Sequence, residues 1–188
     1  ALDGISAGSA DAATWRQMYQ MGSPYGIPLW MTETSGFDDT WQGALDLAGG
    51  MYTALVHGNV EAWVFWTLST DNVDAYSLVD RNFNTSKRYF VSKQFYRYIR
   101  PGAVRIEAST GSGQVLTMAF DHPQEGRTVL LFNFSEEFAK VNLPAAEMGG
   151  NWQIFRTSVS ENCELVDTVD ATEPLLLLPE SVVTLRPE

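Results

Sequence analysis

Hydrophobic positions in the first hundred residues follow two different spacings. In three segments they recur every three or four residues, which predicts helices. The first predicted helix is Ser9–Gly22, capped by Ser9 or Asp11. The second starts at Asp38 or Asp39 and stops at Gly58, and the third is Lys87–Arg100. Two intervening segments, Ile27–Thr34 and Val60–Leu68, are apolar at nearly every position, which predicts buried strands. Helices alternating with strands predict a parallel sheet with helical crossovers.

After Pro101 the hydrophobic spacing changes to two, which predicts antiparallel strands. We therefore expect a domain boundary at Pro101-Gly102, between an α/β part (residues 1–100) and a β-sandwich (residues 101–188). Glu125-Gly126 has the composition of a hairpin turn. The predicted strands of the sandwich are Val104–Ile106, Val115–Phe120, Thr128–Phe134, Lys140–Leu143, Trp152–Phe155, Leu175–Leu178 and Val182–Leu185.

Glu33 ends the first predicted strand, just before the turn-forming residues Ser35 and Gly36. A carboxylate on a buried strand is unfavourable unless hydrogen bonds, a partner or a substrate compensate it. In α/β barrels the carboxyl ends of the strands form the active-site face, so this position predicts a catalytic carboxylate. A hydrogen-bonded structural Glu at a strand end is the alternative interpretation.

Trp66 stands near the carboxyl end of the second predicted strand, as Glu33 does on the first. An aromatic ring at the mouth of a pocket offers an apolar surface to the C–H face of a sugar. Ordinary core packing is the alternative. Because side chains alternate along a strand, Trp63 and Phe65 are predicted to face the other way, against the helices.

Composition narrows the classes of function. Of 188 residues, 12 are basic and 23 acidic, and a net charge of −11 disfavours nucleic acid and anionic membranes as partners. Cys163 is the sole cysteine and there are two histidines, so we expect no disulfide, no metal and no cofactor. No apolar run is long enough to span a membrane. The chain begins with neither Met nor a signal pattern, and we expect it to be cut from a longer one.

Three motifs together resemble glycoside hydrolase family 30: TETSG after the first strand, AWVFWTLS on the second, and KRYFVSKQFYRYIRPGAVRI at the junction. That family joins a (β/α)8 barrel to a side β-sandwich and includes xylanases, glucosylceramidases and β-1,6-glucanases. The resemblance implies α/β plus all-β structure: the last part of a TIM barrel, with its seventh and eighth strands, followed by an antiparallel sandwich. It also implies a retaining β-glycosidase that is secreted or periplasmic at full length.

The resemblance also implies roles for particular residues. Glu33 matches the nucleophile, and Trp66 matches the aromatic residue that lines the sugar pocket. The acid/base Glu of the family lies on the fourth strand, upstream of this chain, and Glu61 is no substitute because it starts its strand at the opposite face. Arg81, in the loop after the last strand, is a candidate for binding an acidic substituent of the carbohydrate substrate, with a solvated loop Arg as the alternative.

Other charged residues receive structural interpretations. Arg88, Arg97, Arg100 and Arg105 are predicted to donate hydrogen bonds between the domains, because no Gly-rich loop accompanies them as a phosphate site would need. Asp71 and Asp74 are too few for a calcium site.

Two functions other than catalysis stay open: a non-catalytic carbohydrate-binding sandwich, and a scaffold fragment. The alternation of Trp152 with Ile154 favours a core position and so disfavours the binding module. The isolated chain, without the rest of a barrel, is expected to be inactive and to self-associate.

Overall fold

The computed structural model describes residues 11–111 and 113–188. The chain forms two compact units, residues 1–89 and 90–188, and the division falls within helix α3 (Lys87–Tyr96). This point lies earlier in the chain than Pro101-Gly102. In the described residues no helix is both long and apolar enough to cross a membrane.

Side-chain caps start the helices α1 and α2 of the first unit. Helix α1 (Ala12–Gly22) begins after Asp11, whose carboxylate accepts a hydrogen bond from the Thr14 amide at 2.8 Å. Ser9, the other predicted cap, lies outside the described residues. A 3-10 turn, η1 (Ser23–Tyr25), follows α1.

Helix α2 (Trp41–Gly58) begins after Thr40, which caps it by accepting from the Gly43 amide at 3.0 Å. The predicted start at Asp38 or Asp39 was therefore wrong by one or two residues. The residue that ends α2 is Asn59, whose backbone is left-handed with φ 47°. Gly58, the predicted stop, belongs to the helix, and packing requires it to be small: a Cβ there would lie 2.8 Å from Cε3 of Trp15.

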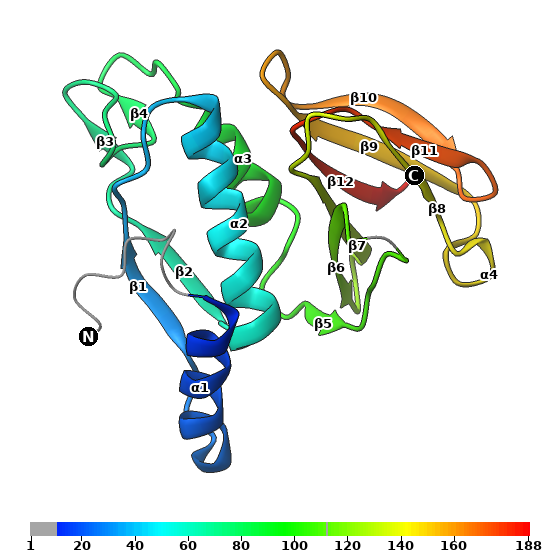
Figure 1. Cartoon of the computed structure of the whole chain (residues 1–188), viewed down its shortest axis with the longest axis horizontal. Helices are drawn as coiled ribbons and strands as arrows, with labels where there is room; N and C mark the ends of the chain where they lie inside the picture. The colour runs from blue at the N-terminus through cyan, green and yellow to red at the C-terminus, as the bar shows by residue number, and fades with distance from the viewer. Residues whose placement is uncertain (1–10, 112) are drawn as a thin grey trace. The chain divides into compact units, whose positions relative to one another are not determined.

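Strands β1 (Trp30–Thr34) and β2 (Ala62–Phe65) pair in parallel, as the helix–strand alternation predicted. Figure 1 shows the two strands side by side with α2 between them in the chain. The core of the unit is formed by Trp15, Ala54 and Val60, with Trp63 packed against it. Only one sheet face is covered by the described residues, since Trp30 is 58% and Val64 48% exposed. The prediction of two fully buried strands was wrong for the other face.

The second unit is an antiparallel sandwich, as predicted. Its large sheet has the order β10-β9-β12-β7-β6-β5, and a two-stranded sheet, β11-β8, packs on one face of it. Glu125 and Gly126 turn the β6-β7 hairpin, where Gly126 has φ 74° and His122 pairs with it. The strands are β5 (Val104–Ile106), β6 (Val115–His122), β7 (Gly126–Asn133), β8 (Ala139–Asn142), β9 (Asn151–Thr157), β10 (Asn162–Asp170), β11 (Pro174–Leu177) and β12 (Ser181–Pro187).

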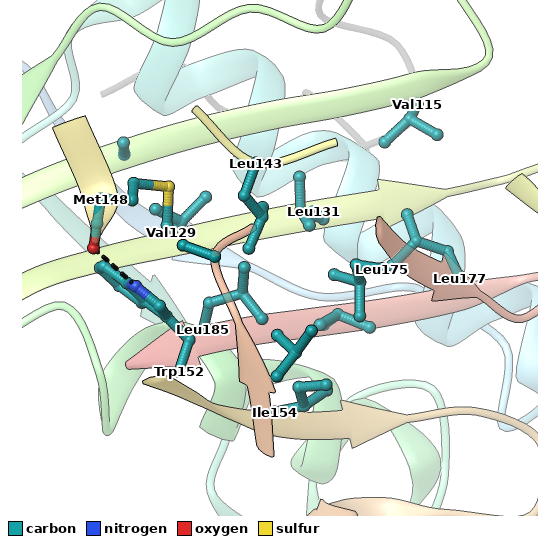
Figure 2. Close-up of a cluster of buried hydrophobic side chains, with 14 of the residues drawn as sticks. Val115, Val129, Leu131, Leu143, Met148, Trp152, Ile154, Leu175, Leu177 and Leu185 are labelled. Carbon is teal, nitrogen blue, oxygen red and sulfur yellow. Dashed lines mark hydrogen bonds between the residues drawn. The ribbon is translucent and has the colours of Figure 1, made fainter. Parts of the chain in front are cut away.

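Trp152 belongs to the core of this sandwich. Its indole Nε1 donates to the carbonyl of Met148 at 2.9 Å, and the ring packs among aliphatic side chains from both sheets (Figure 2). Met148 ends the short helix α4 (Ala145–Met148), which the sequence analysis did not predict. The core position favoured by the alternation with Ile154 is confirmed.

The last turns of α3 pack on the sandwich through Gln94, which is fully buried. Its side-chain amide donates to Thr157 Oγ1 at 2.8 Å, and its carbonyl oxygen accepts from Thr184 Oγ1 at 2.6 Å. These contacts explain why this end of the helix belongs to the second unit rather than to the first.

Candidate active site

A β-bulge presents Glu33 at the carboxyl edge of the β1-β2 sheet. Met31 pairs with Trp63 and Thr34 with Phe65, so two residues of β1, Thr32 and Glu33, stand opposite one residue of β2. An extra residue in a strand re-aims the side chains around it, and bulges are common next to active sites. Here the bulge leaves Glu33 exposed and Thr34 buried.

Solvent therefore reaches the Glu33 carboxylate. No hydrogen bond or ion pair joins its side chain to another described residue. The prediction of a buried, costly charge at Glu33 is wrong, because the face of the sheet away from the helices is open here. The Glu33 carboxylate is instead available to contact a ligand at the sheet edge.

Trp66 lies beside the Glu33 turn. Its backbone amide donates to the Thr34 carbonyl at 2.7 Å, which continues the β1-β2 pairing past the end of β2. The peptide bond from Trp66 to Thr67 is cis. The side chain of Trp66 is 56% exposed, so plain core packing is excluded in the described structure. The structure thus brings Glu33 and Trp66 to one edge, as their sequence positions predicted.

The residues that alternate with Trp66 face the helices, as predicted. Trp63 joins the cluster around Trp15, and Phe65 stacks on Phe37 with ring centroids 6.3 Å apart. Glu61, by contrast, precedes β2 and donates its amide to the Leu29 carbonyl at 2.9 Å. It therefore stands at the amino end of the parallel pair, opposite the edge that carries Glu33.

The loop after β2 has more order than its polar sequence indicated. It contains two short parallel strands, β3 (Ser69–Thr70) and β4 (Val79–Asp80). Asp80 closes a tight turn after β4 by accepting from the backbone amides of Asn82 and Asn84, each at 2.8 Å. The hydrogen bond from the Asn84 side chain, more than any other effect, lowers the pKa of Asp80 below its usual range.

Arg81 follows β4 and is paired with an acidic neighbour. Its Nε lies 2.6 Å from Asp71 Oδ1, and both side chains are well exposed. Within the described residues no hydrogen bond or ion pair joins Arg81 to Glu33 or Trp66. The described residues also contain no group of three or more side chains placed to hold a metal ion.

The turn after β1 is tied to the loop after β2. The Gly36 amide donates to the Ala75 carbonyl at 3.0 Å, and the Thr67 amide donates to the Tyr76 carbonyl. The segments that follow the carboxyl ends of β1 and β2 are therefore joined by backbone hydrogen bonds outside the sheet itself. This connection fixes the residues on either side of the open edge.

Arg88 has other partners than those predicted from the sequence. It was predicted to donate hydrogen bonds between domains, but its guanidinium is fully buried and its partners, Phe37, Asp39 and Asp74, all lie in the first unit. Burial lowers the pKa of Arg88, and the Asp39 carboxylate opposes that effect. Arg100, predicted with it, pairs with Glu125 of the second unit at 3.4 Å.

The chain is similar to known xylanases. It is 32% identical over 90 residues to the glucuronoxylanase XynC of Bacillus subtilis (strain 168), a match that covers 45% of this chain and 20% of that protein. No protein-family model matches the chain.

Solved structures share its fold over nearly its whole length. A family 30 endoxylanase from Clostridium papyrosolvens C71 matches with a TM-score of 0.78 and 22% identity, over 97% of this chain and 46% of that one. A conserved exported protein from Bacteroides fragilis matches with a TM-score of 0.82 and 17% identity, over 97% of this chain and 44% of that one. The chain thus resembles the carboxyl-terminal portion of family 30 xylanases and spans less than half the length of these two structures.

Proposed function

We propose that this chain is the carboxyl-terminal portion of a retaining β-glycoside hydrolase in which Glu33 is the nucleophile. The observation that carries the proposal is the bulge in β1, which exposes the Glu33 carboxylate at the strand end to which the exposed Trp66 is joined by its backbone amide. Glycoside cleavage with retention uses a carboxylate as its nucleophile, and an exposed indole offers an apolar face to a sugar ring. The similarity to xylanases supports the same reaction class.

The reaction proceeds in two displacements. A carboxylate oxygen of Glu33 forms a bond to the anomeric carbon while the bond to the leaving oxygen breaks, and a general acid protonates that oxygen. Water then attacks the same carbon while the conjugate base of that acid takes a proton from the water, and the bond from the anomeric carbon to Glu33 breaks, which releases the sugar and returns the carboxylate. Because the two carboxyl groups of such enzymes lie about 5–5.5 Å apart, the general acid must reach the edge that carries Glu33. We place it on a strand outside this chain.

Trp66 and Arg81 are assigned to substrate binding. The exposed indole of Trp66 offers its face to a sugar ring, and Arg81 is the cation that an acidic substituent of the polysaccharide would meet in the loop after β2. Asp71 already neutralises Arg81, so an acidic substituent has to compete with that ion pair. The full-length enzyme is proposed to be secreted or periplasmic, in line with the exported protein that shares the fold.

The carbohydrate-binding alternative lacks a comparable observation. Trp152, the only Trp after residue 100, is buried in the sandwich core with its Nε1 bonded. No specific feature of the described sandwich favours a sugar platform there, and we do not propose that function.

Azide rescue tests the proposal in the longer protein, that is, in the proposed full-length enzyme that contains this chain together with the rest of the barrel. Glu33→Ala is expected to lose aryl β-glycosidase activity, and added azide is expected to restore cleavage and give the α-glycosyl azide, since azide replaces the missing nucleophile. Glu61→Ala is the matched control, because it removes an exposed Glu at the opposite end of the same strand pair. Retained activity in Glu33→Ala, or a β-glycosyl azide, would contradict the assignment.

A further inference from the structure

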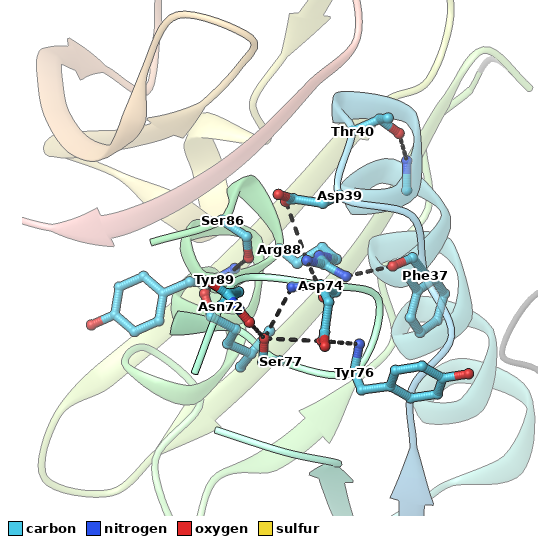
Figure 3. Close-up of polar contacts among 12 residues, drawn as sticks. Phe37, Asp39, Thr40, Asn72, Asp74, Tyr76, Ser77, Ser86, Arg88 and Tyr89 are labelled. Atoms are coloured by element: carbon cyan, nitrogen blue, oxygen red, sulfur yellow. Dashed lines mark hydrogen bonds and ion pairs between the residues drawn. The ribbon is translucent and has the colours of Figure 1, made fainter. Parts of the chain in front are cut away.

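We propose that Arg88 is a positioning residue, which holds the turn after the Glu33 strand and the loop after the Trp66 strand at a fixed spacing. The inference rests on the proposed function of Glu33 and Trp66. Arg88 lies at the start of α3, and its side chain is fully buried between these two segments (Figure 3).

The guanidinium contacts both segments at once. One terminal nitrogen donates to the carbonyl of Phe37, in the turn that follows β1. The other donates to the carbonyl of Asp74, in the loop after β2, at 2.7 Å, and lies 3.2 Å from Asp39 Oδ1. A single side chain thus contacts backbone carbonyls both in the turn after β1, which follows Glu33, and in the loop after β2, which follows Trp66.

The acceptor in the loop is itself held rigidly. The Asp74 carboxylate accepts from the Tyr76 amide at 2.9 Å and from the hydroxyl of Ser77 at 3.2 Å. Ser77 is fully buried. Because Asp74 belongs to this closed turn, holding its carbonyl in place holds the whole turn in place.

From that turn the connection to the reacting groups is short. The Tyr76 carbonyl accepts from the amide of Thr67, the residue after Trp66. On the other side, Gly36, directly before Phe37, donates its amide to the Ala75 carbonyl. A shift of the guanidinium therefore changes the position of Glu33 relative to Trp66.

The chemistry of the site requires Arg. Its planar guanidinium can donate to acceptors in several fixed directions, whereas the compact ammonium of Lys cannot span Phe37 and Asp74 in the same way. The Nε–H of Arg88 has no acceptor among the described residues, which is unfavourable for a buried donor. The terminal nitrogens of Arg88 therefore make their three contacts despite the free-energy cost of the unpaired Nε–H, which is consistent with a role in positioning.

Kinetics of the longer protein separate positioning from simple support. Displacing a catalytic group by about 1 Å can lower the rate about 100-fold. We therefore expect Arg88→Lys to lower kcat about 100-fold while KM changes less, since sugar contacts on other strands remain. Arg100→Lys is the control: it alters an exposed ion pair in the second unit and should leave both constants unchanged.

A milder variant covers the case in which Arg88→Lys does not fold. Asp39→Asn removes only the carboxylate charge from the cluster, at a side chain that is 47% exposed, and is expected to lower kcat in the same direction by a smaller factor. Values of kcat within twofold of wild type in Arg88→Lys, or in Asp39→Asn where Arg88→Lys does not fold, would overturn the inference.

Hydrogen exchange tests the role of Arg88 independently of the proposed function, because it does not require glycosidase activity. If the longer protein cleaves no glycoside, or cleaves it without Glu33, the proposed function fails. Exchange at the Gly36 amide of the 188-residue chain still tests Arg88: it should accelerate about tenfold or more in Arg88→Lys, with the β7-β12 ladder unaffected. Unchanged exchange at Gly36 would overturn the positioning role itself.

Discussion

Replacing Gln94 by Met should destabilise the sandwich unit measurably. The two side chains have similar length, so the exchange removes hydrogen bonds without leaving a large cavity. Gln94 sits on α3 and is fully buried against β9 and β12. It was not among the residues that the sequence marked as important.

The magnitude follows from the bonds that Gln94 makes. Its amide nitrogen has two protons for three acceptors: Thr157 Oγ1 at 2.8 Å, the Val182 carbonyl at 3.3 Å and the Phe155 carbonyl at 3.4 Å. Its oxygen accepts from Thr184 Oγ1 at 2.6 Å. Three hydrogen bonds at about 1 kcal/mol each give a loss of about 3 kcal/mol.

Part of that loss is recovered locally. In the wild type the hydroxyl of Thr157 already lies 3.5 Å from the Phe90 carbonyl, and that of Thr184 lies 3.5 Å from the carbonyl of residue 94. Each hydroxyl can turn toward that second acceptor. We therefore expect the free energy of unfolding to fall by roughly 2–3 kcal/mol.

Cys163 provides the assay. It is the only cysteine of the chain, lies in the sandwich unit and is 4% exposed. Burial raises the pKa of its thiol, so the folded unit should react slowly with a thiol reagent. The midpoint of labelling against urea concentration then reports the stability of this unit alone.

Gln114→Met is the matched control, because Gln114 makes one exposed hydrogen bond, to Ser135 at 3.0 Å. It should change the unfolding free energy by less than about 0.5 kcal/mol. If Gln94→Met costs no more than this control, the reasoning about the buried amide is refuted.

Three further predictions concern the first unit. Gly58→Ala should destabilise it by about 1–3 kcal/mol in thermal unfolding, because the new methyl would lie 2.8 Å from Trp15; an unchanged midpoint would contradict the packing. The turn closed by Asp80 should open in acid: its folded pKa is lowered, so its stabilisation is present above the usual value of 3.8 and is lost as pH falls below it. Exchange at the Asn84 amide should show this loss, and Asp80→Asn should abolish the dependence on pH. The 188-residue chain alone should cleave no aryl glycoside and should self-associate through the face that carries Trp30 and Val64, so monomeric sedimentation would count against the second expectation.

Periodicity alone predicted most of the elements. Apolar residues at spacing two located β5 at Val104–Ile106 without error, and the hairpin turn at Gly126 followed from its composition. Strand β10 (Asn162–Asp170) was missed because most of its positions are exposed, so its sequence, NCELVDTVD, lacks a hydrophobic alternation. Hydrophobic patterns reveal burial, and most positions of β10 are exposed.

Helix ends were harder to predict because several residues compete for each cap. Asp38, Asp39 and Thr40 all have cap chemistry, and only the backbone decides that Thr40 accepts from Gly43. At the other end, Asn59 takes the left-handed position that Gly58 was expected to take. Which of two neighbouring candidates ends a helix depends on tertiary contacts such as that of Gly58 with Trp15.

The site was predictable in outline only. The positions of Glu33 and Trp66 at strand ends follow from the sequence, and the structure places both at one edge. The bulge that exposes Glu33 does not follow from it, since nothing in WMTET marks an extra residue. Nor does the role of Arg88, because its partners come from segments far away in the chain.

Covalent trapping tests the central claim most directly. The longer protein is treated with an activated 2-deoxy-2-fluoro glycoside, which slows the second displacement so that the glycosyl-enzyme accumulates. Peptide mass mapping is predicted to find one sugar, attached to the peptide that contains Glu33, and none in Glu33→Gln. A label on any other carboxylate, or an equal label in Glu33→Gln, would contradict the account.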